Sequence, residues 1–125
     1  DIIVSYAQNV KLEATGSVTV KGKLAYDCDV VAGTDIVIAG ECRSGSYMAR
    51  SSIVAHTIGS IGMGVPSLAV SEEGFIRAAL FHPGVMLKVG PFEYKIDTTK
   101  HNVEFRIEEG VLVRRAVRRG IGSLV

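Results

Sequence analysis

Residues 12–24 read LEATGSVTVKGKL, and residues 30–42 read VVAGTDIVIAGEC. The second stretch repeats the pattern of the first at an offset of 18 in the numbering. The matching positions are Ala14 and Ala32, Val18 and Ile36, Val20 and Ile38, Gly22 and Gly40, and Leu24 and Cys42. A repeat this short cannot bury its own apolar face, so it stacks on its neighbours to form a continuous core. The two stretches therefore predict a solenoid.

Further copies of the repeat are expected on both sides of this pair. The same offset, taken back from Val20, Gly22 and Leu24, gives Ile2, Val4 and Tyr6. We therefore expect the sequence to open partway through a coil. A looser third copy follows at an offset of 17 in the numbering. It places Ala49, Ile53 and Ala55 at the positions of Ala32, Ile36 and Ile38.

Apolar residues alternate within each copy, as at Val18 and Val20, and this is the period of a strand with one buried face. Glycines at 16, 22, 33 and 40 fit corners, where we expect them to adopt positive φ angles. Crossovers between parallel strands are nearly always right-handed. The predicted fold is therefore an all-β, right-handed parallel β-solenoid of about 18 residues per coil. A left-handed hexapeptide helix of the same period is the structural alternative.

The solenoid pattern is interrupted at GSIGMGVPS (59–67) and then resumes as far as Gly90, so residues 1–90 are predicted to form coils. From residue 91 the segments PFEYKI, NVEFRI and GVLVRR alternate apolar with charged residues, and DTTKH and EEG lie between them as turns. Antiparallel hairpins over 91–113 would cap the last coil and cover its exposed edge. Residues 114–125 are expected to form a basic tail with a short helix.

Composition narrows the class of protein. The chain of 125 residues is the length of one domain, and 14 Lys and Arg nearly balance 13 Asp and Glu, so a nucleic-acid partner is not expected. No apolar run approaches the roughly 18 residues that span a bilayer. Two cysteines make no disulfide framework and no signal peptide is evident, which favours the cytoplasm. Because the first residue is Asp1, we expect this chain to be part of a longer protein.

The side chains that could support chemistry are scattered. His56, His82, His101, Cys28 and Cys42 do not occur in the close pairs of a structural zinc site, so no metal and no cofactor are predicted. Cys42 is expected to be a core group stacked on Leu24. His56 alternates with Ile53 and Ala55 and is expected to face solvent.

Two further motifs have ordinary structural readings. The glycine-rich run GSIGMG (59–64) lacks the strand, helix and lysine of a phosphate-binding loop, so we interpret it as a corner or loop. A basic cluster near the end of the chain could contact an acidic partner or an anion, although a solvated terminus is the simpler reading. The cluster consists of Arg114, Arg115, Arg118 and Arg119.

The repeat is followed by ARSSIVAHTIGS (49–60), FHPGVMLKVG (81–90) and EEGVLVRR (108–115). Together these segments resemble the β-solenoid domain of the flagellar assembly protein A family over nearly the whole chain. The resemblance implies a cytoplasmic bacterial protein that acts through protein contacts in the assembly or placement of flagella. Members of that family often carry a long helical hairpin between the HTIGS-like and PGV-like segments, and this chain has only residues 61–80 there.

The leading hypothesis is therefore a non-enzymatic structural module that binds other proteins. The sequence does not identify these partners, and it does not say whether the chain forms a homo-oligomer. One alternative is a solenoid acyltransferase that uses His56 or His82 as general base between subunits. A left-handed coil and a trimer in solution would favour that enzyme, and a right-handed coil would nearly exclude it. The other alternative is a bactofilin-like subunit of a cytoskeletal polymer.

Overall fold

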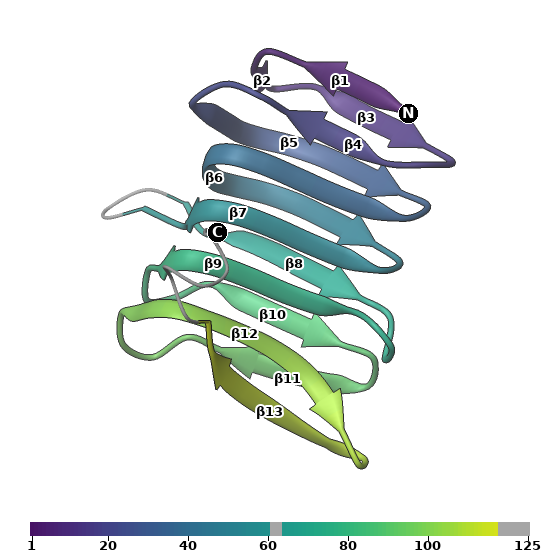
Figure 1. Cartoon of the computed structure of the whole chain (residues 1–125). Coiled ribbons are helices and arrows are strands. Elements are labelled where there is room, and N and C mark those ends of the chain that lie inside the picture. The colour runs from purple at the N-terminus through teal and green to yellow at the C-terminus, as the bar shows by residue number, and fades with distance from the viewer. Residues whose placement is uncertain (61–63, 118–125) are drawn as a thin grey trace.

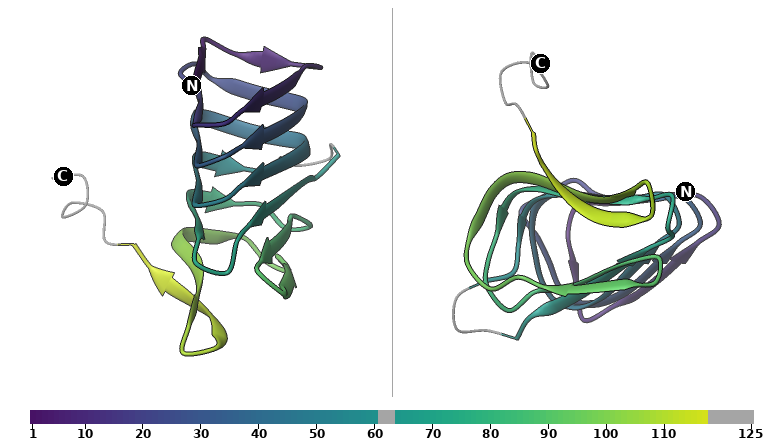
Figure 2. Two further views of the ribbon diagram at one scale, coloured as in Figure 1. Left: turned by 90° about the vertical axis from the view of Figure 1, so that its right-hand side faces the viewer. Right: turned by 90° about the horizontal axis from the view of Figure 1, so that it is seen from below.

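The computed structural model describes residues 1–60 and 64–117. It is an all-β solenoid of about 5 turns with roughly 18 residues per coil, as the sequence predicts. The coils wind in a right-handed sense from the N-terminal end to the cap (Figures 1 and 2). No helix in these two described ranges is long and apolar enough to cross a membrane.

Each coil has two long sides, which we call the front and back sheets. The front sheet contains β1 (Ile2–Val4), β4 (Val18–Val20), β7 (Ser52–Ile58) and β9 (Phe75–Phe81). The back sheet contains β3 (Lys11–Ala14), β8 (Pro66–Val70) and β10 (Met86–Val89). A short third side holds β2 (Ala7–Gln8) and the start of β5 (Leu24–Ala32), which then enters the back sheet. The long β6 (Asp35–Ala49) passes through all three sides.

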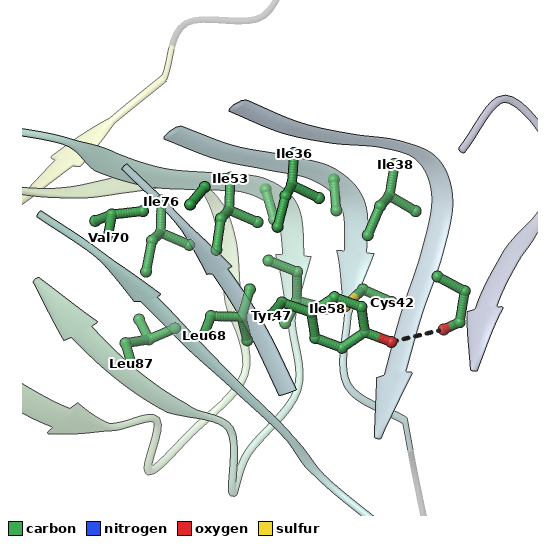
Figure 3. Packing of buried hydrophobic residues seen from close by; sticks show 14 of the residues in the cluster. Ile36, Ile38, Cys42, Tyr47, Ile53, Ile58, Leu68, Val70, Ile76 and Leu87 are labelled. Atoms are coloured by element: carbon green, nitrogen blue, oxygen red, sulfur yellow. Dashed lines mark hydrogen bonds between the residues drawn. The ribbon is translucent and has the colours of Figure 1, made fainter. Parts of the chain in front are cut away.

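Equivalent positions of successive coils stack directly and build the core. In the front sheet Val18 pairs with Ile36, Ile36 with Ile53, and Ile53 with Ile76. In the back sheet the corresponding column is Leu12, Val30, Tyr47, Leu68 and Leu87. Most of these side chains are buried, and the two columns face each other across the interior (Figure 3). Burial of such aliphatic side chains stabilises the fold by about 1.5–3 kcal/mol each.

The predicted register of the third copy is confirmed, since Ala32 pairs with Ala49 and Ile38 with Ala55. Two other predicted registers are wrong. The first coil is shorter than expected: Ile2 pairs with Val18 and Val4 with Val20, so the offset is two residues less than the predicted one. Coil length changes at the corners, while the strands keep their pairing.

The second wrong register concerns Cys42, which pairs with Ala25, whereas Leu24 pairs with Glu41. The offset between these two coils is one residue less here than where β4 pairs with β6. At the same corner the register between β6 and β7 also shifts, between Ile38 and Glu41.

The role predicted for the corner glycines is also wrong. Glycines 16, 22, 33 and 40 do not have positive φ angles. Close approach of the coils explains three of them: a Cβ on Gly22 would collide with the carbonyl oxygen of Ser5, one on Gly33 with that of Thr15, and one on Gly40 with that of Lys23. Gly45 does have a positive φ of 106°, and a Cβ there would also collide with the backbone of Cys28.

The predicted antiparallel cap is present, with a different connection from the one expected. β11 (Phe92–Lys95) pairs with β10 and extends the back sheet, whereas β12 (Lys100–Glu108) pairs with β9 and extends the front sheet. DTTKH is therefore not a hairpin turn, because it crosses from one sheet to the other and its last two residues begin β12. EEG does contain the turn between β12 and β13 (Val111–Ala116).

Arg114 and Arg115 lie in strand β13, so the cap continues to Ala116 and the predicted tail does not begin at residue 114. The helix expected over this segment is wrong for residues 114–116. Pairing with β12 explains the difference, because residues 111–116 form a continuous antiparallel ladder with residues 103–108.

Candidate interaction surfaces

The histidines and cysteines lie apart from one another. His56 is exposed, as predicted, and its Nδ1 lies 2.8 Å from Oγ1 of Thr57. His82 directly follows β9, and His101 lies in β12. Within residues 1–60 and 64–117 no three His, Cys, Asp or Glu side chains gather in a way that could hold a metal ion.

Cys42 is a core group, as predicted, although its neighbour in the adjacent coil is Ala25. Cys28 is also buried, and both thiols are free. Burial raises the pKa of the Cys42 thiol well above its ordinary value, and a hydrogen bond with Tyr47 only partly opposes this rise. The Tyr47 hydroxyl donates to the carbonyl oxygen of Ser44 at 2.9 Å, so the phenol is fixed inside the core.

The glycine-rich run 59–64 includes residues 61–63, which lie outside the described residues. Pro66 begins β8, a strand, so a helix does not follow this run as it would in a phosphate-binding loop.

The outer face of the back sheet carries a row of apolar side chains. Val31, Met48 and Ala69 are outward neighbours on β5, β6 and β8, and the next neighbour, on β10, is the charged Lys88. Met86 lies beside this row on β10. The exposed fractions are 37% for Val31, 52% for Met48 and 36% for Met86. Glu13 and Glu93 border the row on β3 and β11, so its apolar centre has charged ends.

This face is hollowed at β8. Ser67 and Ala69 are small, whereas Met48 on one side and Met86 and Lys88 on the other are long. The difference in side-chain length leaves a shallow, largely apolar hollow of about 360 Å³ between the neighbouring strands. A flexible methionine on each side suits the hollow to irregular apolar surfaces.

A second cluster lies on the outer face of the front sheet, where the solenoid meets the cap. Glu104 on β12 is only 4% exposed although it points outward. Its Oε1 accepts from Nη2 of Arg77 at 2.6 Å, and its Oε2 accepts from Nη1 of Arg106 at 2.7 Å. Both guanidinium groups also lie over the ring of Phe75, at 4.8 Å and 5.6 Å from its centre. The cluster fastens the cap to β9.

Two of the four predicted contact residues can be placed. Arg115 lies on the outer side of β13, with its Nε 3.1 Å from Oε2 of Glu108. Arg114 points to the other side of the strand, next to Phe105 in register. Both are exposed. Arg118 and Arg119 lie outside the described residues.

Sequence reasoning missed the apolar row and the Glu104 cluster. The row had a signal: VVA (30–32) and YMA (47–49) are apolar at outward positions, where alternation would place polar residues. Glu104 had no comparable signal, because its partner Arg77 depends on the register between β9 and β12.

Comparison of the chain with protein-family models, with curated proteins and with solved structures found no match.

Proposed function

We propose that this chain is a non-enzymatic structural and protein-interaction module, acting in the cytoplasm in the bacterial flagellar-assembly role that its sequence resembles. The observation that carries the proposal is the exposed apolar row that includes Val31 and Met48 on the back sheet, with Met86 exposed beside it. Contiguous exposed apolar groups of this kind mark protein contacts more often than scattered ones do.

The shape of the row supports a protein partner. It extends over successive coils of the back sheet. The inner side of this sheet is packed into the core by a buried column of side chains, which are Val30, Tyr47, Leu68 and Leu87. A partner that covers the row therefore meets a preformed surface and loses little free energy in ordering it. The hollow beside it is shallow, which suits a protuberance on a protein better than an enclosed small molecule.

The right-handed winding supports this proposal over the acyltransferase alternative, which is tied to a left-handed coil. The polymer alternative is tested separately, by whether the purified chain forms filaments in the electron microscope.

The proposal is tested by photo-crosslinking in bacterial cells that express the chain. Benzoylphenylalanine is placed at Met48 or at Val37, which is 39% exposed on the front sheet and serves as the matched control. We expect a protein adduct from position 48 and much less from position 37. We also expect Val31→Asp to suppress the adduct from position 48, because a buried unpaired carboxylate opposes the contact.

Equal adducts at both positions, or none at 48, would contradict the proposed surface. Mass spectrometry of the adduct tests the biological part of the proposal. A partner unconnected with flagella would refute the flagellar role, and a second copy of the chain would identify a homo-oligomer.

A further inference from the structure

The last strand of the front sheet has a free edge. Within the described residues β13 pairs only with β12. In an antiparallel pair, alternate residues direct their main-chain N–H and C=O groups toward the partner and away from it. The N–H of Val117 donates to the carbonyl of Asn102 at 2.6 Å, which sets this alternation. Residues 111, 113 and 115 therefore bond to β12, and Leu112, Arg114 and Ala116 direct their main-chain groups to the free edge.

This edge is preformed. Glu109 and Gly110 connect β12 to β13 with φ angles of 52° and 81°, as in a type I′ turn, whose twist matches that of the paired strands. The ion pair between Arg115 and Glu108 links the two strands beside the turn. A regular open edge of this kind is a template for another strand, and natural proteins usually cover it or charge it.

The strand at this edge carries a basic side chain that is available to a partner. Arg114 and Arg115 are exposed on opposite sides of β13, and Arg114 makes no ion pair within residues 1–60 and 64–117. Strand β13 contains two arginines and no acidic residue. A second copy of β13 would bring like charges together across the pair, which is unfavourable. An acidic strand would instead be complementary.

A hollow beside the edge adds a place for an apolar side chain. Leu112 and Arg114 lie on the side of β13 that faces the end of the core, in register with Ile107 and Phe105. Together with Tyr94, whose ring centre is 5.4 Å from that of Phe105, they surround a hollow of about 150 Å³. A strand added at the edge would place alternate side chains on this side.

We propose that the free edge of β13 binds an extended acidic segment of a partner protein as an additional strand. Main-chain hydrogen bonds to Leu112, Arg114 and Ala116 would hold the segment, an acidic side chain would pair with Arg114, and an apolar side chain would enter the hollow. This mode of strand addition is a recognised way to bind peptides. The inference shares with the proposed function only the premise that the partner is a protein.

The test uses the 125-residue chain and a fluorescent peptide of alternating aspartate pairs and valine pairs. Fluorescence anisotropy should show binding that weakens as salt increases, because the ion pair is exposed to solvent. A peptide of alternating lysine pairs and valine pairs should not bind. Failure of the acidic peptide to bind, or equal binding of both peptides, overturns the proposal.

Two matched variants test whether the peptide adds as a strand. Ala116→Pro removes an N–H that points to the free edge, keeps every arginine and leaves the bonds to β12 in place. Ala116→Val keeps that N–H and is the control. We expect the proline variant to bind about 10-fold more weakly than the valine variant. Equal binding by the two variants, with both folded by circular dichroism, overturns strand addition.

Hydrogen exchange measured by NMR gives a readout that charge alone would not change. On peptide binding the amides of Leu112, Arg114 and Ala116 should become protected, whereas those of residues 111, 113 and 115 should change little. Lack of selective protection overturns the proposal. Met48→Asp should leave peptide binding unchanged, because Met48 lies on the back sheet. The peptide test therefore examines the edge of β13 independently of the surface proposed on the back sheet.

Discussion

Gly45 combines two constraints that only glycine satisfies. Its φ of 106° lies in the left-handed region, and an added Cβ would meet the backbone of Cys28 in the preceding coil. Gly110 has a φ of 81° with nothing within 4 Å of an added Cβ, so it has only the first constraint. We predict that Gly110→Ala lowers the free energy of unfolding by about 1 kcal/mol and Gly45→Ala by about 3 kcal/mol or more.

Urea unfolding of the two alanine variants tests this difference. Their midpoints are compared with that of the unchanged chain at equal slope. Similar losses for both variants would mean that the coils can move apart at Gly45 without strain.

We predict that the folded state loses stability at high pH because Cys42 and Tyr47 are buried. Burial raises the pKa of both groups in the folded chain, so both stay protonated there. In the unfolded chain they titrate near their ordinary values, roughly 8.5 and 10. The folded state then binds more protons, so the free energy of unfolding falls as pH rises above roughly 8.5, by up to about 1.4 kcal/mol per pH unit for each group.

Denaturant unfolding between pH 8 and pH 11 measures this slope, with these limits chosen around the two ordinary pKa values, about 8.5 and 10. Cys42→Ala should lower overall stability and flatten the part of the slope that begins near the ordinary thiol pKa. An unchanged slope in that variant would show that other groups cause the alkaline loss.

At the scale of elements, β12 covers the edge that β9 would otherwise expose. It also covers the core at Ile76 and Ala78, through Phe105 and Val103. We predict that removal of residues 97–125 causes concentration-dependent association, because a long apolar sheet edge is uncovered. Removal of 118–125 alone is the control. Light scattering after size-exclusion chromatography should show larger species for the first truncation and no change for the second.

The pairing of the strands could be predicted only in part. Stacking selects similar residues at equivalent positions, so the columns through Ala14, Val18 and Val20 were visible in the sequence. A corner only has to connect two strands, so its number of residues can vary from coil to coil. The changed offsets at Ile2 and at Cys42 were therefore not visible in the sequence. In the cap the alternation in PFEYKI and NVEFRI identified strands, yet alternation does not say which strand is the neighbour.

At the scale of the whole molecule, the fold was easier to predict than the surfaces. The core produces a repeated sequence pattern because equivalent positions of successive coils pack against one another. Of the predicted contact residues, Arg114 and Arg115 are exposed on an open edge, but their chemistry depends on where β13 ends the sheet. The apolar row and Met86 beside it come from β5, β6, β8 and β10, and only the stacking register brings Val31, Met48 and Met86 onto one face.

The direct stacking of coils also makes the length of the molecule adjustable in fixed increments. Neighbouring strands lie about 4.8 Å apart, so one coil of about 18 residues adds about 4.8 Å between the first coil and the cap. Because each coil contacts only its neighbours, such an insertion leaves the cap and its arginines chemically unchanged. Chains that differ only in the number of coils would therefore hold the same cap at graded distances from the first coil.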